Sequence, residues 1–158
     1  MRLNGRETRT IWRDGDGRGV HVIDQTLLPH RVETRALRDC AAVEAAIRDM
    51  IVRGAPLIGV TGAWGLALAV AEDPGDSGVE TARARLLATR PTAVNLRWAL
   101  ERMCALLLAT PVAQRHAVAC AEAARIADED VATCAAIGDH GAALIHAAAQ
   151  GLDRPLTY

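Results

Sequence analysis

The hydrophobic positions change their spacing after about the first quarter of the chain. In that first part, short β-rich runs around Ile11–Trp12 and Val20–Ile23 are separated by the turn-forming segment Asp14–Gly19. In Arg31–Leu37, uncharged residues alternate with charged ones, as expected for a strand with one buried face. Because short strands joined by turns pair with one another, residues 9–37 predict a small antiparallel sheet of about three strands.

After Asp39 the apolar residues recur every three or four positions, which indicates amphipathic helices. Proline marks several boundaries, since it fits the first turn of a helix and ends the one before it. The expected helices cover about 41–51, 56–71, 79–88, 91–110 and 111–149, the last with room for a break at Gly138–Gly141. The sequence therefore predicts an α+β domain over 1–150 that is mostly helical, with about five helices after the sheet.

The helix expected over Pro56–Ala71 carries three interior glycines, Gly59, Gly62 and Gly65. Each glycine costs a helix interior roughly 1 kcal/mol relative to alanine. We expect the missing side chains to let neighbouring helices pack closely over a buried helix. The segment is apolar enough to suggest a membrane span, but it would rise only about 24 Å, less than a hydrocarbon core of about 30 Å. A buried core helix is the favoured interpretation.

Composition limits the chemistry and the partners. All 18 basic residues are arginine, which excludes a lysine Schiff base and the lysine of a phosphate-binding loop. The formal charge of −1 gives no basic surface for nucleic acid or for an anionic membrane. The polar, arginine-rich N-terminus lacks the apolar run of a secretory signal, so a cytoplasmic location is expected.

The four cysteines do not form a recognisable metal or redox motif. They are Cys40, Cys104, Cys120 and Cys134, and no pair has C-x-x-C spacing. His116 lies four residues before Cys120 on an expected helix and could share a metal ion with it, but no second ligand pair has a matching spacing. Reduced, mostly buried thiols are the favoured interpretation, and no metal or other cofactor is expected.

Two predicted helix starts share one pattern. In Arg53-Gly54-Ala55-Pro56 and in Thr89-Arg90-Pro91-Thr92, an arginine comes just before a first-turn proline. Free N–H groups and the positive end of the helix dipole attract anions, and a guanidinium adds charge-assisted hydrogen bonds to phosphate. Gly54 would let the ligand approach the backbone closely. The alternative is that both arginines pair with carboxylates in solvated loops, so the spacing gives a phosphate-site hypothesis only.

Other polar residues have two interpretations each. Asp24 and Gln25 follow the second strand; one interpretation is that they face a cleft, and the other is that they cap a turn. Asn95 reaches a ligand at its helix start or makes a structural hydrogen bond. Asp139 and His140 are candidates for an acid–base pair, but adjacent helical residues point about 100° apart, which disfavours it. None of these residues forms a convincing nucleophile–base arrangement.

Four segments together resemble methylthioribose-1-phosphate isomerases. They are DQTLLP (Asp24–Pro29), RGAPLIGVTGAWGLALA (Arg53–Ala69), TRPTAVNLRWALERM (Thr89–Met103) and IGDHGAALI (Ile137–Ile145). The likeness covers nearly the whole chain. It implies an aldose–ketose isomerase of methionine salvage and methionine biosynthesis, which converts 5-methylthioribose 1-phosphate to 5-methylthioribulose 1-phosphate. It also implies a homodimeric full-length protein that uses no metal or nucleotide cofactor.

The resemblance implies a binding role for four residues of this chain. Arg53, Gly54 and Ala55 match the family's substrate-contacting Arg-Gly-Ala, and Arg90 matches its second substrate arginine, so the expected ligand is a small phosphorylated sugar.

The catalytic residues of the family are not matched. Its reactive cysteine lies in a Thr-His-Cys-Asn-Ala-Gly stretch of a Rossmann-like second domain, and its acid–base aspartate lies further on. The resemblance places both beyond Tyr158, and none of the four cysteines here has those neighbours. Residues 151–158 resemble the beginning of that second domain. The chain is therefore expected to be inactive alone. Two alternatives remain: a non-catalytic module that binds a sugar phosphate or a partner, and a regulatory protein like the related initiation-factor subunits.

Overall fold

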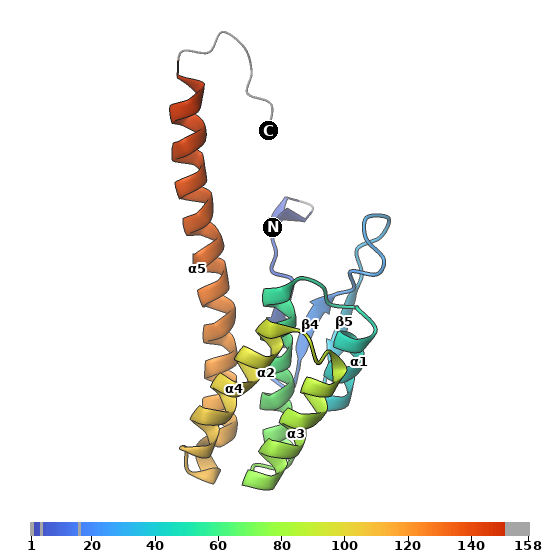
Figure 1. Ribbon diagram of the computed structural model, residues 1–158. Helices are drawn as coiled ribbons and strands as arrows, with labels where there is room; N and C mark the ends of the chain where they lie inside the picture. Colours follow the sequence, from blue (N-terminus) through green and yellow to red (C-terminus); the bar gives the residue numbers. More distant parts are fainter. Residues whose placement is uncertain (1, 4, 16, 151–158) are drawn as a thin grey trace.

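A computed structural model describes residues 2–3, 5–15 and 17–150 (Figure 1). The strands are β1 (Arg2–Leu3), β2 (Arg6–Glu7), β3 (Ile11–Arg13), β4 (Val20–Ile23) and β5 (Thr34–Leu37). The helices are α1 (Cys40–Arg48), α2 (Ala55–Glu72), α3 (Asp76–Thr89), α4 (Val94–Leu108) and α5 (Arg115–Ala149), with a 3-10 turn, η1 (Val112–Gln114), before α5. The predicted small sheet followed by five helices is confirmed. The segment expected to begin a second domain lies outside the described residues.

The main sheet is antiparallel, in the order β3-β4-β5. Ile11 pairs with Val22, and Val20 pairs with Leu37. All four side chains are buried, so one face of the sheet contributes to the core beside α1 and α2. The hairpin of β1 and β2 was not predicted, because strands of two residues are too short to show a period in the sequence.

Helix α2 is the centre of the helical part (Figure 1). It contacts each of the other four α-helices. By length and composition it could cross a membrane, yet 67% of its apolar window is buried inside the fold. This burial confirms the prediction of a core helix.

The three glycines of α2 lie where neighbouring elements come closest. A Cβ atom on Gly59 would lie 2.8 Å from a backbone carbonyl oxygen of α4. On Gly62 it would overlap the Leu96 side chain, and on Gly65 it would lie 2.7 Å from Cγ1 of Val43. Real Cβ atoms essentially never approach other atoms this closely. The glycines therefore serve close packing, as predicted.

Two helix boundaries differ from the prediction. Helix α4 begins at Val94 and not at Pro91, because residues 90–93 form a turn closed by a 3.0 Å hydrogen bond from Ala93 N–H to the Arg90 carbonyl. Helix α3 begins at Asp76, before the expected start at about residue 79, so the connection between α2 and α3 is shorter than predicted.

The predicted break in the last helix is wrong. Helix α5 runs without interruption through Gly138 and Gly141. Both glycines are tolerated because a glycine costs a helix interior only about 1 kcal/mol, and the surrounding alanines favour the helix.

Candidate functional site

The start of α2 is exposed and has no side-chain cap. Gly54 is the N-cap residue, with φ 92°, a conformation that side-chain-bearing residues rarely adopt. Nothing lies within 4 Å of the position that its Cβ would take, so the space beside it is open. The first turn contains Pro56 and no acidic residue. The positive end of the helix dipole is therefore available to an external anion.

Arg53 lies directly before this helix start and is exposed. Its Nε donates a long, 3.4 Å hydrogen bond to the Met50 carbonyl, and within the described part of the chain it forms no ion pair. The preceding segment is held to the loop after β4 by a 2.9 Å hydrogen bond from Gln25 N–H to the Ile51 carbonyl. Because the hydrogen bond to Met50 is long and no described residue forms an ion pair with Arg53, the Arg53 guanidinium remains available to a ligand.

The start of α4 has the same character. Arg90 is the C-cap of α3, and its half-buried side chain makes no hydrogen bond or ion pair with the described residues. Ala93 is the N-cap of α4 and has no side-chain cap, and the first turn of α4 contains no acid. Proline was expected inside this first turn; it lies in the turn before it instead. Arg90 therefore lies at the beginning of the turn that leads into this uncapped helix start, three residues before its N-cap.

Helices α2 and α4 run side by side in the same direction (Figure 1). The Cβ position of Gly59 faces the Asn95 carbonyl, and one turn later that of Gly62 faces Leu96 and Leu100. Both helix starts, and the arginine before each, consequently lie at one end of the domain.

A small hollow of about 230 Å³ opens between these two helix starts and α5. It is lined by Pro56, Gly59, Val60, Asn95, Trp98, Ile126, Glu129, Asp130 and Thr133. The charge of Glu129 is balanced by Arg102, which donates hydrogen bonds of 2.6 and 2.8 Å to its two oxygens and lies over the Trp98 ring. These bonds lower the pKa of Glu129.

Sequence reasoning missed the ion pair between Arg102 of α4 and Glu129 of α5, because no local pattern in the sequence pairs residues 27 positions apart. We call this ion pair the clamp between α4 and α5. Asn95 does line the hollow, but no hydrogen bond of its side chain decides between its two interpretations.

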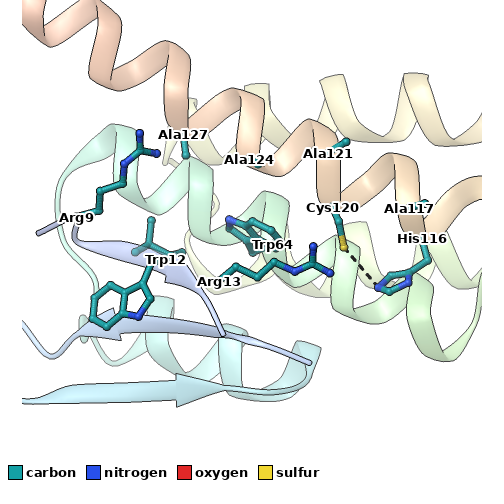
Figure 2. Close-up of a pocket in the computed structure, with 11 residues that line it drawn as sticks. Arg9, Trp12, Arg13, Trp64, His116, Ala117, Cys120, Ala121, Ala124 and Ala127 are labelled. Carbon is teal, nitrogen blue, oxygen red and sulfur yellow. Dashed lines mark hydrogen bonds between the residues drawn. The ribbon is translucent and has the colours of Figure 1, made fainter. Parts of the chain in front are cut away.

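A second hollow, of about 550 Å³, lies between β3 and the first half of α5 (Figure 2). Trp64 of α2 lines it, and none of the four predicted substrate-contacting residues does. His116 Nε2 is 3.5 Å from Cys120 Sγ, so the predicted neighbours do meet. No group of three histidine, cysteine or acidic side chains that could hold a metal exists among the described residues.

The buried cysteines are not activated nucleophiles. Burial, with the nearby Glu44 carboxylate, raises the pKa of Cys40 to about 12, and burial raises the pKa of Cys104 to about 11. Burial also raises the pKa of Cys120. These three thiols stay protonated at neutral pH, as expected for structural cysteines. Cys134 is the exposed one of the four.

Asp24 organises a loop and does not face a cleft. It is fully buried and accepts hydrogen bonds of 3.0 and 2.6 Å from the N–H and hydroxyl of Thr26, and of 2.6 Å from Nε of Arg35. The Thr26 hydroxyl, and then Arg35, hold the pKa of Asp24 below its usual value despite the opposing effect of burial. Turn capping, one of its two predicted roles, is the one observed.

This arrangement predicts a pH-dependent contribution to stability. Because the folded pKa of Asp24 is lowered, its carboxylate stabilises the fold above its unfolded pKa, near 3.8, and this contribution is lost as pH falls through the folded pKa. Asp24→Asn should therefore reduce the free energy of unfolding at pH 7, and the difference from wild type should shrink towards about pH 2. Urea unfolding across this pH range is the measurement, with Asp139→Asn on exposed α5 as the control. A difference independent of pH would contradict the assignment.

The neighbours Asp139 and His140 do not act as a pair. His140 Nδ1 lies 2.6 Å from the Ala136 carbonyl oxygen of its own helix, and no hydrogen bond joins it to Asp139 in the described structure. The predicted divergence of adjacent helical side chains accounts for this.

Comparison with known proteins identifies the family. Residues 51–151 match the initiation factor 2 subunit family. The chain is 53% identical to a methylthioribose-1-phosphate isomerase of Methylorubrum extorquens over 99% of this chain and 43% of that protein. It is 57% identical to an uncharacterized protein of Rhodospirillum rubrum over 92% of this chain and 79% of that one.

A solved structure agrees with the fold. The crystal structure of 5-methylthioribose 1-phosphate isomerase from Pyrococcus horikoshii superimposes with a TM-score of 0.72 at 36% identity, covering 80% of this chain and 37% of that one. The chain thus spans about two fifths of the length of the isomerases it matches. It belongs to the initiation factor 2 subunit family, in the branch that contains the methylthioribose-1-phosphate isomerases.

Proposed function

We propose that this chain is the substrate-anchoring part of a methylthioribose-1-phosphate isomerase of methionine salvage. The complete enzyme would convert 5-methylthioribose 1-phosphate to 5-methylthioribulose 1-phosphate in the cytoplasm and would act as a homodimer. The observation that carries the proposal is the pair of uncapped helix starts at one end of the domain, with Arg53 directly before the N-cap of α2 and Arg90 in the turn that leads into α4.

In this proposal the phosphate and sugar hydroxyls bind at the two helix starts. The backbone of Gly54 and Ala55 approaches the ligand through the open space beside Gly54. Arg53 and Arg90 supply the permanent positive charge, in the forked geometry that suits phosphate. These contacts do not change during the reaction, so they would lower the Michaelis constant without raising the turnover rate.

Proton transfer would come from elsewhere in the enzyme. On the family pattern, the reactive cysteine and the acid–base aspartate belong to a second domain, and no cysteine of this chain has the neighbours of the reactive one. The raised pKa of Cys40, Cys104 and Cys120 supports this division, because a protonated, buried thiol is a poor nucleophile. No metal or cofactor is required by this scheme.

The alternative is a module that binds a sugar phosphate or a partner without catalysis. The match to the uncharacterized Rhodospirillum rubrum protein, 57% identical and covered over 79% of its length, supports it. Both functions use the same anchoring residues. They differ in whether a second domain restores turnover.

Binding tests the shared part of the proposal. In a calorimetric titration with 5-methylthioribose 1-phosphate, Arg53→Gln and Arg90→Gln should each raise the Kd about tenfold or more, because each removes a charge-assisted contact. Arg31→Gln is the matched control, since Arg31 is exposed and pairs with Glu33 in another loop. Equal affinity of all three variants and wild type would refute anchoring by these arginines.

A further inference from the structure

The hollow between β3 and the first half of α5 is separate from the two helix starts. Its volume of about 550 Å³ lies within the usual range for small-molecule sites, about 300 to 1,000 Å³. One side of it is a strip of small residues that recur every three or four positions along α5: Ala117, Cys120, Ala121, Ala124 and Ala127. No residue of the proposed sugar-phosphate site lines it, so its role is a different one.

Trp64 brings an unused hydrogen-bond donor to this hollow. The residue is only 6% exposed. A buried tryptophan normally finds an acceptor for its indole N–H, yet this N–H donates to no group of the described residues. The nitrogen is not among the fully enclosed polar atoms that lack a partner, so it opens on the hollow that the side chain lines. An unpaired donor in this position indicates a site for an acceptor from outside the chain.

The charged side chains of the hollow are cations. Arg9 and Arg13 line it, and no described acidic side chain does. Arg9 is neutralised by Asp128, whose carboxylate lies 2.6 Å from Nη1 of Arg9. Arg13 forms no ion pair with the described residues, and its Nη2 donates only a long, 3.3 Å hydrogen bond to the Gly17 carbonyl.

The Arg13 guanidinium is directed into the hollow. Its side chain extends towards Cys120 (Figure 2). Its charge acts to lower the pKa of the Cys120 thiol, against the larger effect of burial. Within the described structure, the positive charge of Arg13 therefore faces the hollow without a counter-ion.

We propose that this hollow binds a small aromatic carboxylate. The carboxylate pairs with Arg13, whose planar guanidinium presents the paired donors that suit such a group. The Trp64 N–H donates a hydrogen bond to an oxygen of the same ligand. The flat ring lies on the strip of small α5 residues, where the removal of apolar surface from water adds to the binding free energy.

The charge and lining of the hollow favour a carboxylate over a sugar phosphate. A carboxylate carries one negative charge, which matches the one unpaired charge of Arg13. A phosphate monoester carries about −1.5 to −2 at pH 7, and the excess charge would be costly beside apolar side chains. No described serine, threonine, asparagine or glutamine lines the hollow to bind sugar hydroxyls. The ligand class therefore differs from the one proposed for the helix starts.

Calorimetric titration of the 158-residue chain with 2-naphthoate tests the proposal. Wild type should bind this probe saturably, with a Kd below about 1 mM. The neutral 2-naphthamide and 2-naphthyl phosphate should bind at least about tenfold more weakly. Arg13→Gln should raise the Kd for 2-naphthoate about tenfold, because it removes a charge-assisted contact. Arg31→Gln is the control, since Arg31 pairs with Glu33 in another loop.

A second pair of variants tests the location. Ala121→Leu should also raise the Kd about tenfold or more, because the larger side chain fills the hollow. Ala121 is exposed, so the fold should tolerate the change. Ala105→Leu, at an exposed position of α4 outside the hollow, should bind as wild type does. Circular dichroism should show all variants folded.

The indole N–H signals of the ¹⁵N-labelled chain test the role of Trp64. The chain has three tryptophans, so Trp12→Phe and Trp98→Phe assign the signals. Binding of 2-naphthoate should shift the Trp64 signal and leave the Trp98 signal in place. Absence of saturable binding, equal binding of the amide, or a larger shift at Trp98 would overturn the proposal. Arg13→Gln should leave the affinity for 5-methylthioribose 1-phosphate unchanged, so this site can fail independently of the proposed function.

Discussion

The 158-residue chain alone should form no detectable 5-methylthioribulose 1-phosphate, and mixing it with the C-terminal portion of a relative should produce turnover. Moving hydrogen between adjacent sugar carbons requires a group placed to exchange a proton at the reacting centre. It also requires an environment that stabilises the developing charge. Arg53, Gly54, Ala55 and Arg90 anchor the ligand and do neither. Ketose formation measured on purified proteins is the test.

The mixture needs two controls. The C-terminal portion alone should be inactive, and Arg53→Gln in the mixture should lose most of the restored activity while leaving the helical content unchanged. Turnover by the isolated 158-residue chain would contradict the division of roles. Ligand binding with no activity in any mixture would favour the non-catalytic alternative.

Replacing Gly59 by alanine should lower the free energy of unfolding by about 2 kcal/mol, within the usual range for overpacking. Helix propensity alone predicts the opposite, a gain of about 1 kcal/mol. Packing prevails because the new Cβ would lie 2.8 Å from the Asn95 carbonyl oxygen. That atom belongs to the backbone of α4 and cannot rotate away. Denaturant unfolding measures the difference.

Two variants separate packing from propensity. Gly62→Ala should cost less than Gly59→Ala, because its new Cβ meets the end of the flexible Leu96 side chain. Ala105→Gly, at an exposed position in α4, should cost about 1 kcal/mol by propensity alone. An unchanged or higher stability of Gly59→Ala would show that α2 and α4 are not held as closely as described.

The elements predicted correctly are those with a strong local signal. The uncharged run and the three glycines of α2 identified a buried, closely packed helix, because both features act within one helix. The sheet followed from short alternating runs and turn residues. Local signals failed where tertiary packing decides. Pro91 suits a helix start, yet the turn at Arg90–Ala93 postpones α4 to Val94.

The candidate site could be predicted only in part. Sequence motifs identified Arg53 and Arg90 as separate features, each beside its own helix. Their location at one end of the domain depends on the approach of Gly59 to Asn95, which no local pattern encodes. The clamp from Arg102 to Glu129 beside the hollow has the same origin, since it joins α4 to α5. The hollow between β3 and α5 likewise became apparent only when the rest of the fold was in place.

The central claim is that this domain binds a sugar phosphate at the paired starts of α2 and α4. Mapping backbone amide shifts in the ¹⁵N-labelled chain during titration with 5-methylthioribose 1-phosphate tests it most directly. The account predicts the largest changes at Gly54, Ala55 and Leu57 and at Val94 and Asn95. Changes confined to the hollow between β3 and α5, or no saturable change anywhere, would contradict it.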